Sequence, residues 1–176
     1  MEQYTKLARD DEEVWADASQ YRRLVGRLLY LQATRPDITY SVNVLSQFVA
    51  DPRANDMEAV MRVLRYLKAT LGQGILLSKE GGTNLVGYTD SDWLGCPDTR
   101  RLRSGYLLLL GGSPISWKSK KQPVISRSSA KAEYRAMATT VSEFLWLRWL
   151  LMELKVEQDV AFRPAKGKEN MLDDKL

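Results

Sequence analysis

Two acidic residues, Asp90 and Glu133, have the sequence context of metal ligands in a hydrolytic enzyme. Asp90 ends the stretch 85–90, a predicted strand, and α/β and α+β enzymes commonly place site residues at strand ends. Glu133 follows Ser128 and Ser129, which are predicted to cap a long helix whose dipole favours an ionised carboxylate near its start. If this helix packs on the sheet, two hard oxygen ligands converge at one rim, as Mg²⁺ requires.

Each carboxylate also has an ordinary structural explanation. The Asp-Ser-Asp string at 90–92 is typical of a turn, and Asp92 is expected to cap a loop. A glutamate early in a helix commonly complements the dipole and does nothing else. Phosphodiester hydrolysis by two Mg²⁺ ions about 4 Å apart would need both side chains at one place. The metal hypothesis therefore depends on the strand and the helix bringing Asp90 and Glu133 together.

Basic residues surround the two carboxylates and suggest a polyanionic ligand. Residues 85–135 contain nine Lys or Arg and four Asp or Glu, whereas residues 1–20 contain two basic and six acidic side chains. A solvated surface is the alternative explanation. A tryptophan beside lysines can stack on bases, whereas Trp146 and Trp149 lie on a leucine-rich helix and are expected in the core. The predicted nucleic-acid contacts are Arg100, Arg101, Trp117, Lys118, Lys120, Lys121 and Arg127.

The composition excludes several kinds of site. The chain has no histidine, which excludes Ser-His-Asp triads, Cys-His dyads and His-ligated zinc. A single cysteine, Cys96, excludes an internal disulfide, as is common in a reducing compartment. No apolar run reaches the roughly 20 residues of a membrane span, and residues 1–4 do not resemble a secretory signal. We therefore expect a cytoplasmic or nuclear protein that is neither secreted nor in a membrane.

The elements that must position the carboxylates divide the 176 residues into four segments. Residues 1–17 are a flexible acidic lead-in. Residues 18–73 have apolar spacings of three and four and predict three helices, the third capped by Asn55 or Asp56. Residues 74–157 predict strands at 85–90, 105–110 and 115–118 and then a long helix, a β-β-β-α order, with residues 75–77 as a candidate for a further short strand. Residues 158–176 carry no periodicity and predict a disordered tail. The fold class is α+β.

Several strings resemble the ribonuclease H domain of copia-type LTR retrotransposon Pol polyproteins. They include GYTDSDW at 87–93, PISWKSKKQP at 114–123 and SRSSAKAEYRA at 126–136. The upstream strings at 21–31 and 34–38 are similar to the segment between reverse transcriptase and ribonuclease H. The resemblance implies a partial RNase H-like fold whose family hydrolyses RNA in RNA–DNA hybrids with two Mg²⁺ ions. Asp90 matches the family's aspartate of the first strand, and Glu133 matches its glutamate of the first helix.

Two departures from the family pattern predict that this copy is inactive. The third carboxylate of the family, on a strand after the long helix, and the fourth, further on, have no match here. Their absence leaves an incomplete metal site, and the missing strands are expected to leave a sheet edge unpaired. The expected partners are an RNA–DNA hybrid and other parts of a Pol polyprotein. The alternatives are a nucleic-acid-binding module without catalysis, or a secreted effector, because residues 100–103 spell the Arg-x-Leu-Arg string associated with such proteins.

Overall fold

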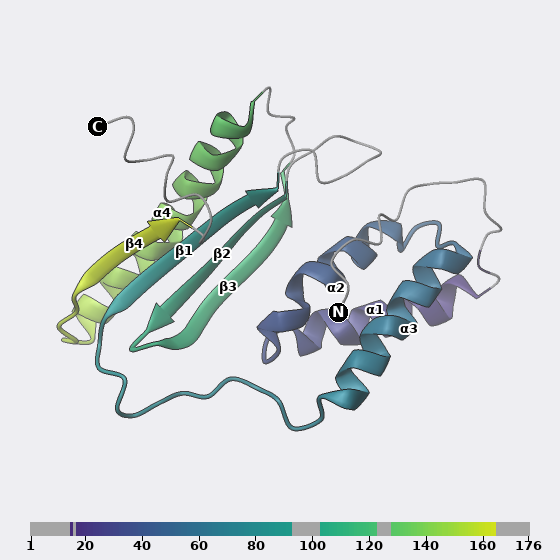
Figure 1. The fold of residues 1–176 in the computed structure, drawn as a ribbon, viewed down its shortest axis with the longest axis horizontal. Coiled ribbons are helices and arrows are strands. Elements are labelled where there is room, and N and C mark those ends of the chain that lie inside the picture. The colour runs from purple at the N-terminus through teal and green to yellow at the C-terminus, as the bar shows by residue number, and fades with distance from the viewer. Residues whose placement is uncertain (1–14, 16, 93–102, 123–127, 165–176) are drawn as a thin grey trace. The chain divides into compact units, whose positions relative to one another are not determined.

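The computed structural model describes residues 15, 17–92, 103–122 and 128–164, and it confirms the α+β class. The chain divides into two compact units, Met1–Ile75 and Leu76–Leu176, which we call the helical unit and the β unit. Figure 1 shows helices alone in the first and a sheet with one long helix in the second. Within the described ranges, no helix is long and apolar enough to cross a membrane.

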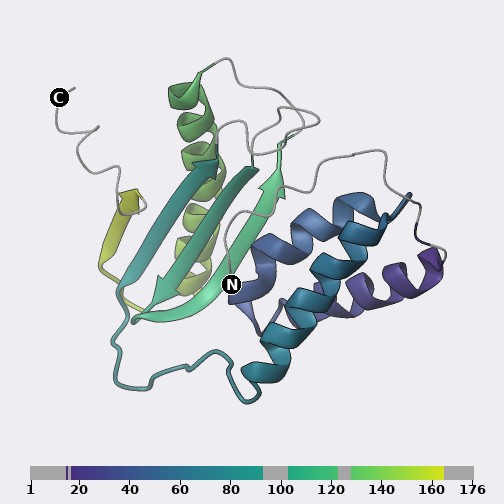
Figure 2. The same ribbon diagram turned by 45° about the vertical axis from the view of Figure 1, so that its right-hand side comes forward.

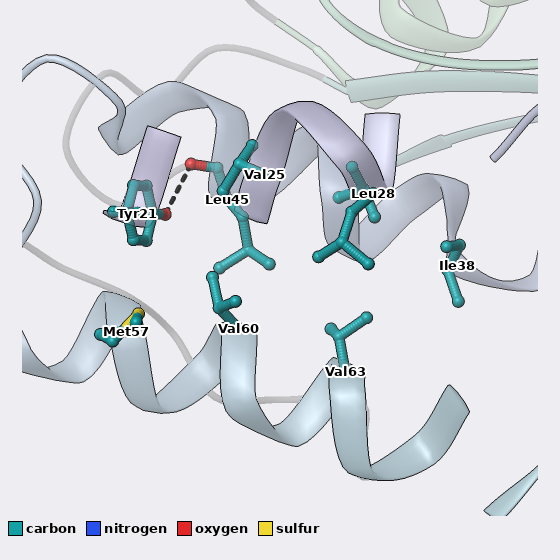
Figure 3. Packing of buried hydrophobic residues seen from close by; sticks show 9 residues of the cluster. Tyr21, Val25, Leu28, Ile38, Leu45, Met57, Val60 and Val63 are labelled. Carbon is teal, nitrogen blue, oxygen red and sulfur yellow. Dashed lines mark hydrogen bonds between the residues drawn. The ribbon is translucent and has the colours of Figure 1, made fainter. Parts of the chain in front are cut away.

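The helical unit contains the three predicted helices, α1 (Ala18–Leu31), α2 (Thr39–Leu45) and α3 (Ala54–Ala69). Their apolar stripes meet in one core, drawn in Figure 3, to which α1 contributes Tyr21, Val25 and Leu28. The hydroxyl group of Tyr21 is buried there and donates a hydrogen bond of 2.8 Å to the carbonyl oxygen of Leu45. Burial, aided by the nearby charge of Asp56, raises the pKa of Tyr21 far above its usual value.

One helix start differs from the sequence prediction, and another follows a 3₁₀ turn. Residues Pro36–Ile38 form a 3₁₀ turn, and α2 begins only after them. The third helix is capped by Arg53, whose backbone N–H donates to the carboxylate of Asp56 at 2.8 Å. Asp56, one of the two predicted N-cap residues, is instead the third residue of the helix. Its side chain accepts a hydrogen bond from the N-cap backbone, as in a capping box.

The β unit is a four-stranded sheet in the order β3-β2-β1-β4. The strands β1 (Leu85–Asp92), β2 (Arg103–Leu110) and β3 (Ser113–Lys121) form an antiparallel meander, and β4 (Val160–Pro164) pairs parallel to β1. The long helix α4 (Ser129–Glu153) lies along one face of this sheet in both ribbon views (Figures 1 and 2). Its cap is Ser128, as predicted, and the side chain accepts from the N–H of Lys131.

The core of the β unit lies between α4 and the sheet. Leu85 and Leu108 are fully buried there against Phe144, Leu147 and Leu151 of the helix. Each residue buried this way contributes about 1.5–3 kcal/mol relative to exposure, so these contacts fix α4 on the sheet.

The chain turns between β2 and β3 at Gly111, which approaches another loop closely. Its φ is +55°, a left-handed value that glycine adopts most readily. A Cβ atom at Gly111 would lie 2.3 Å from the carbonyl oxygen of Gly82, so no larger residue fits without a backbone shift.

Three sequence expectations for the β unit are wrong. Residues 75–77 form no strand, and Leu76 and Leu77 are exposed because no neighbouring strand pairs with them. Residues 160–164, expected within a disordered tail, form β4 because the edge of β1 offers them a full set of backbone partners. β1 is therefore paired on both sides, and the edge strands of the described sheet are β3 and β4. Trp146 and Trp149, expected in the core, are 56% and 62% exposed.

Candidate functional site

The two candidate carboxylates lie at the same end of the β unit. Asp92, at the end of β1, is in register with Arg103 of β2, which is in register with Lys121 at the end of β3. The helix α4 begins at this end as well, as Figures 1 and 2 show. Asp90 of β1 and Glu133 of α4 therefore both lie near this end of the β unit.

A buried hydroxyl pair fixes the height of α4 above β1. The Oγ1 atoms of Thr140 and Thr89 are 2.9 Å apart, and both residues are buried. Glu133 is two helical turns closer to the rim than Thr140, and its side chain is half-buried. Since Thr89 contacts the helix and successive side chains of a strand alternate, Asp90 projects from the opposite face of the sheet, and it is exposed.

The described part of β4, the strand beside β1, contains no third carboxylate. The neighbouring strand β4 consists of Val160, Ala161, Phe162, Arg163 and Pro164, and its last residue is in register with Thr89. Asp159, the acidic residue closest to β4, lies at the far end, where its carbonyl oxygen accepts from the N–H of Leu85 at 2.9 Å. In the ranges that the structure covers, no three His, Cys, Asp or Glu side chains are grouped as a metal site would require. The side chains that the structure describes therefore do not by themselves complete a two-Mg²⁺ centre.

The predicted nucleic-acid residues of β3 are divided between the two faces of the sheet. Lys118 is in register with Tyr106, which is in register with Thr89, so Lys118 and Lys120 lie on the helix side and are exposed. Trp117 and Lys121 lie on the other side and are half-buried. These four residues cannot form one continuous surface. Arg100, Arg101 and Arg127 lie outside the described residues.

A polar cluster in the helical unit was not anticipated from the sequence. The guanidinium group of Arg35 is buried and binds the carboxylate of Asp37 through two nitrogen atoms, at 2.9 and 2.7 Å. It also donates to Thr70 at the end of α3, and it lies 5.7 Å from the ring centre of Tyr66. The hydrogen bond from Arg35 lowers the pKa of Asp37. The cluster joins the α1–α2 connection to α3, and its role is structural.

Comparison with known proteins identifies the family. No protein-family model and no solved structure matches the chain. The chain is 48% identical, over 80% of its length, to the Retrovirus-related Pol polyprotein from transposon RE1 of Arabidopsis thaliana. It is 44% identical, over 72% of its length, to the Secreted RxLR effector protein 161 of Plasmopara viticola, of which it covers 90%. The chain is homologous to a region of copia-type retrotransposon Pol polyproteins. 

This copia-type Pol segment is short beside most of those relatives. It covers 10% of the RE1 polyprotein. It covers 55% of the Uncharacterized mitochondrial protein AtMg00810 of Arabidopsis thaliana, with which it is 45% identical over 75% of its own length. The chain therefore spans little more than half of one of these two relatives and a tenth of the other.

Proposed function

We propose that the β unit is a retrotransposon-derived RNase H-like domain that no longer hydrolyses RNA in RNA–DNA hybrids. The observation that carries this proposal is the composition of β4. This strand pairs with β1 as far as Thr89, the residue before Asp90, and none of its five described residues is acidic. Mg²⁺ is bound through carboxylates and substrate phosphates, and two-ion hydrolysis needs ligands for both ions. Asp90 and Glu133 alone do not supply enough of them.

The proposed loss of catalysis is tested with the full chain, Mg²⁺ and an end-labelled RNA–DNA hybrid. We expect no cleavage above that of the Asp90→Asn variant, because the site lacks ligands for a second ion. Mg²⁺-dependent cleavage that disappears in Asp90→Asn and in Glu133→Gln would overturn the proposal. Cleavage equal in the wild-type chain and both variants would identify a contaminating nuclease and leave the chain itself inactive, as proposed.

Binding of nucleic acid without cleavage is a second candidate function, favoured by the exposed lysines of β3. Lys118 and Lys120 project from the same face of an edge strand, at a spacing of two residues. Phosphate contacts by these two lysines would make binding weaken as salt rises. For duplex DNA, the logarithm of the binding constant falls with the logarithm of the salt concentration with a slope near −0.9 per contact. We expect the Lys118→Gln, Lys120→Gln variant to reduce this slope by about 1–2.

A matched control for this measurement is Lys68→Gln, since Lys68 is an exposed lysine of α3 in the helical unit. An unchanged slope in the β3 variant, or an equal reduction in the control, would refute binding through β3. The effector function has less support from the geometry. Arg103, the last residue of the Arg-x-Leu-Arg string, belongs to β2 and is 8% exposed, and residues 100–102 lie outside the described residues.

A further inference from the structure

The helix α4 is apolar on two opposite sides. One side packs on the sheet through Phe144, Leu147 and Leu151. At 100° per residue, a second set falls within a sector of about 80° on the far side of the helix. All members of this set are exposed, and we call it the outer stripe of α4: Tyr134, Val141, Leu145, Trp149 and Met152.

A surface helix of a globular protein normally has one apolar face and one polar face. In α4 the sheet already covers the inner face, and the outer stripe still exposes large side chains. Tyr134 is 67% exposed, Trp149 is 62% exposed and Met152 is 58% exposed. Trp146, which flanks the stripe, is 56% exposed. A contiguous apolar patch of this kind marks an interaction surface.

Four of the five residues of the outer stripe are placed symmetrically about position 143. Tyr134 and Met152 are equally distant from this position, and so are Val141 and Leu145. An antiparallel copy of the helix would therefore place Tyr134 against Met152 of the second copy, and Val141 against Leu145. A two-fold axis produces this arrangement, in which the same patch is used by both subunits.

The charges at the ends of α4 favour the same orientation. Lys131 is in the first turn of the helix and Glu153 is its last residue, and both are exposed. Antiparallel packing brings Lys131 of one copy near Glu153 of the other, twice in the dimer. Parallel packing would instead bring each lysine near a lysine and each glutamate near a glutamate, which is repulsive.

The available area suits a small homodimer. Large aromatic side chains bury about 150–250 Å² each when fully covered, and the exposed fractions of the stripe leave about 500 Å² per copy. Two copies would bury about 1,000 Å², the lower bound for a specific interface. We propose that the outer stripe of α4 is a self-association surface on which a second copy of this chain packs in antiparallel orientation.

The first test is the mass of the full chain in solution, measured by sedimentation equilibrium over about 1–100 µM. We expect a reversible monomer–dimer equilibrium and a dimer at least tenfold weaker in Leu145→Lys, which buries a charge in the interface. Met61→Lys is the matched control, because Met61 on α3 is 39% exposed and Leu145 is 37% exposed. A wild-type chain that is monomeric throughout, or a dimer unaffected by Leu145→Lys, would overturn the proposal.

Reversing the charges at the two ends of α4 tests whether the helices pack antiparallel, and it leaves the apolar residues of the outer stripe unchanged. Lys131→Glu and Glu153→Lys each create two like-charge contacts in the antiparallel dimer, so each should weaken dimerisation about threefold to tenfold. The double variant restores both opposite-charge contacts and should return to within about twofold of the wild-type chain. Two single variants without effect, or a double variant as weak as the singles combined, would exclude antiparallel packing. Circular dichroism of each variant verifies that α4 is still folded.

Discussion

The hydroxyl pair of Thr140 and Thr89 offers a sharp test of how α4 is held on the sheet. The two side chains are 1% and 7% exposed, and their Oγ1 atoms are 2.9 Å apart. Valine has the shape and the β-branch of threonine but no hydroxyl group. We therefore consider Thr140→Val, Thr89→Val and the double variant, which together form a double-mutant cycle.

The structure predicts unequal single effects and a nearly neutral double variant. After Thr140→Val, the hydroxyl of Thr89 still has the Gly105 carbonyl oxygen as an acceptor, but at 3.5 Å. A buried polar group without a good partner costs about 1–3 kcal/mol. After Thr89→Val, Thr140 still donates to the Ala136 carbonyl at 2.8 Å, so the cost is about 1 kcal/mol or less. The double variant leaves neither hydroxyl and should be within about 1 kcal/mol of the wild-type chain.

The assay must separate the two units, because a chain with two units need not unfold in one transition. Hydrogen exchange at increasing denaturant gives the free energy of opening for the amides of β1 and α4, and the amides of the helical unit serve as an internal control. A double variant destabilised by the sum of the two single losses would refute the coupling. If the amides of the helical unit lost as much protection as those of β1 and α4, the hydroxyl pair would not act specifically on the β unit.

Three other perturbations have defined outcomes. Arg35→Lys should lower the melting temperature of the helical unit more than Arg62→Lys. Lysine cannot replace the two-nitrogen contact with Asp37, whereas Arg62 pairs with Glu58 on the surface. Equal decreases in melting temperature would contradict this prediction. The hydrogen bond from Arg35 lowers the pKa of Asp37 in the folded chain. The ionised Asp37 therefore stabilises the fold fully above its unfolded pKa of about 3.9, and this stabilisation is lost as the pH falls through its folded pKa. The stabilities of the wild-type chain and Asp37→Asn should then converge in acid, and a constant difference would exclude this linkage. Gly111→Ala should lower the free energy of unfolding in urea by about 1–3 kcal/mol more than Gly112→Ala. Both residues have a positive φ, but only a Cβ atom at Gly111 would meet the Gly82 carbonyl oxygen. Equal urea midpoints for the two variants would exclude this clash.

Local features of the fold were predictable from the sequence because their causes are local. The cap at Ser128 and the apolar spacing of α1 depend on neighbours three or four residues away, and both are confirmed. The strand β4 was missed because its partner Leu85 is far away in the sequence and its five residues have no pattern of their own. Trp146 and Trp149 were misplaced because composition alone does not say which side of a helix the sheet covers.

The candidate site was predictable only in outline. Strand-end and helix-start positions bring Asp90 and Glu133 to one rim, since β1 ends and α4 begins there. The face from which Asp90 projects depends on the contact between Thr89 and Thr140, which pattern alone cannot reveal. The division of Trp117 and Lys118 between the two faces follows from strand alternation, and it could have been anticipated once the strand at 115–118 was recognised.

The position of β4 also has a consequence for synthesis on the ribosome. The first two strands can pair as soon as residue 110 has emerged, but Leu85 meets its second partner only when Val160 is available. At about 5–20 residues per second, one flank of the nascent β1 strand waits for several seconds without backbone partners. During that interval the growing chain offers an extended template to any other unpaired strand, so a translational pause before β4 would favour misassembly.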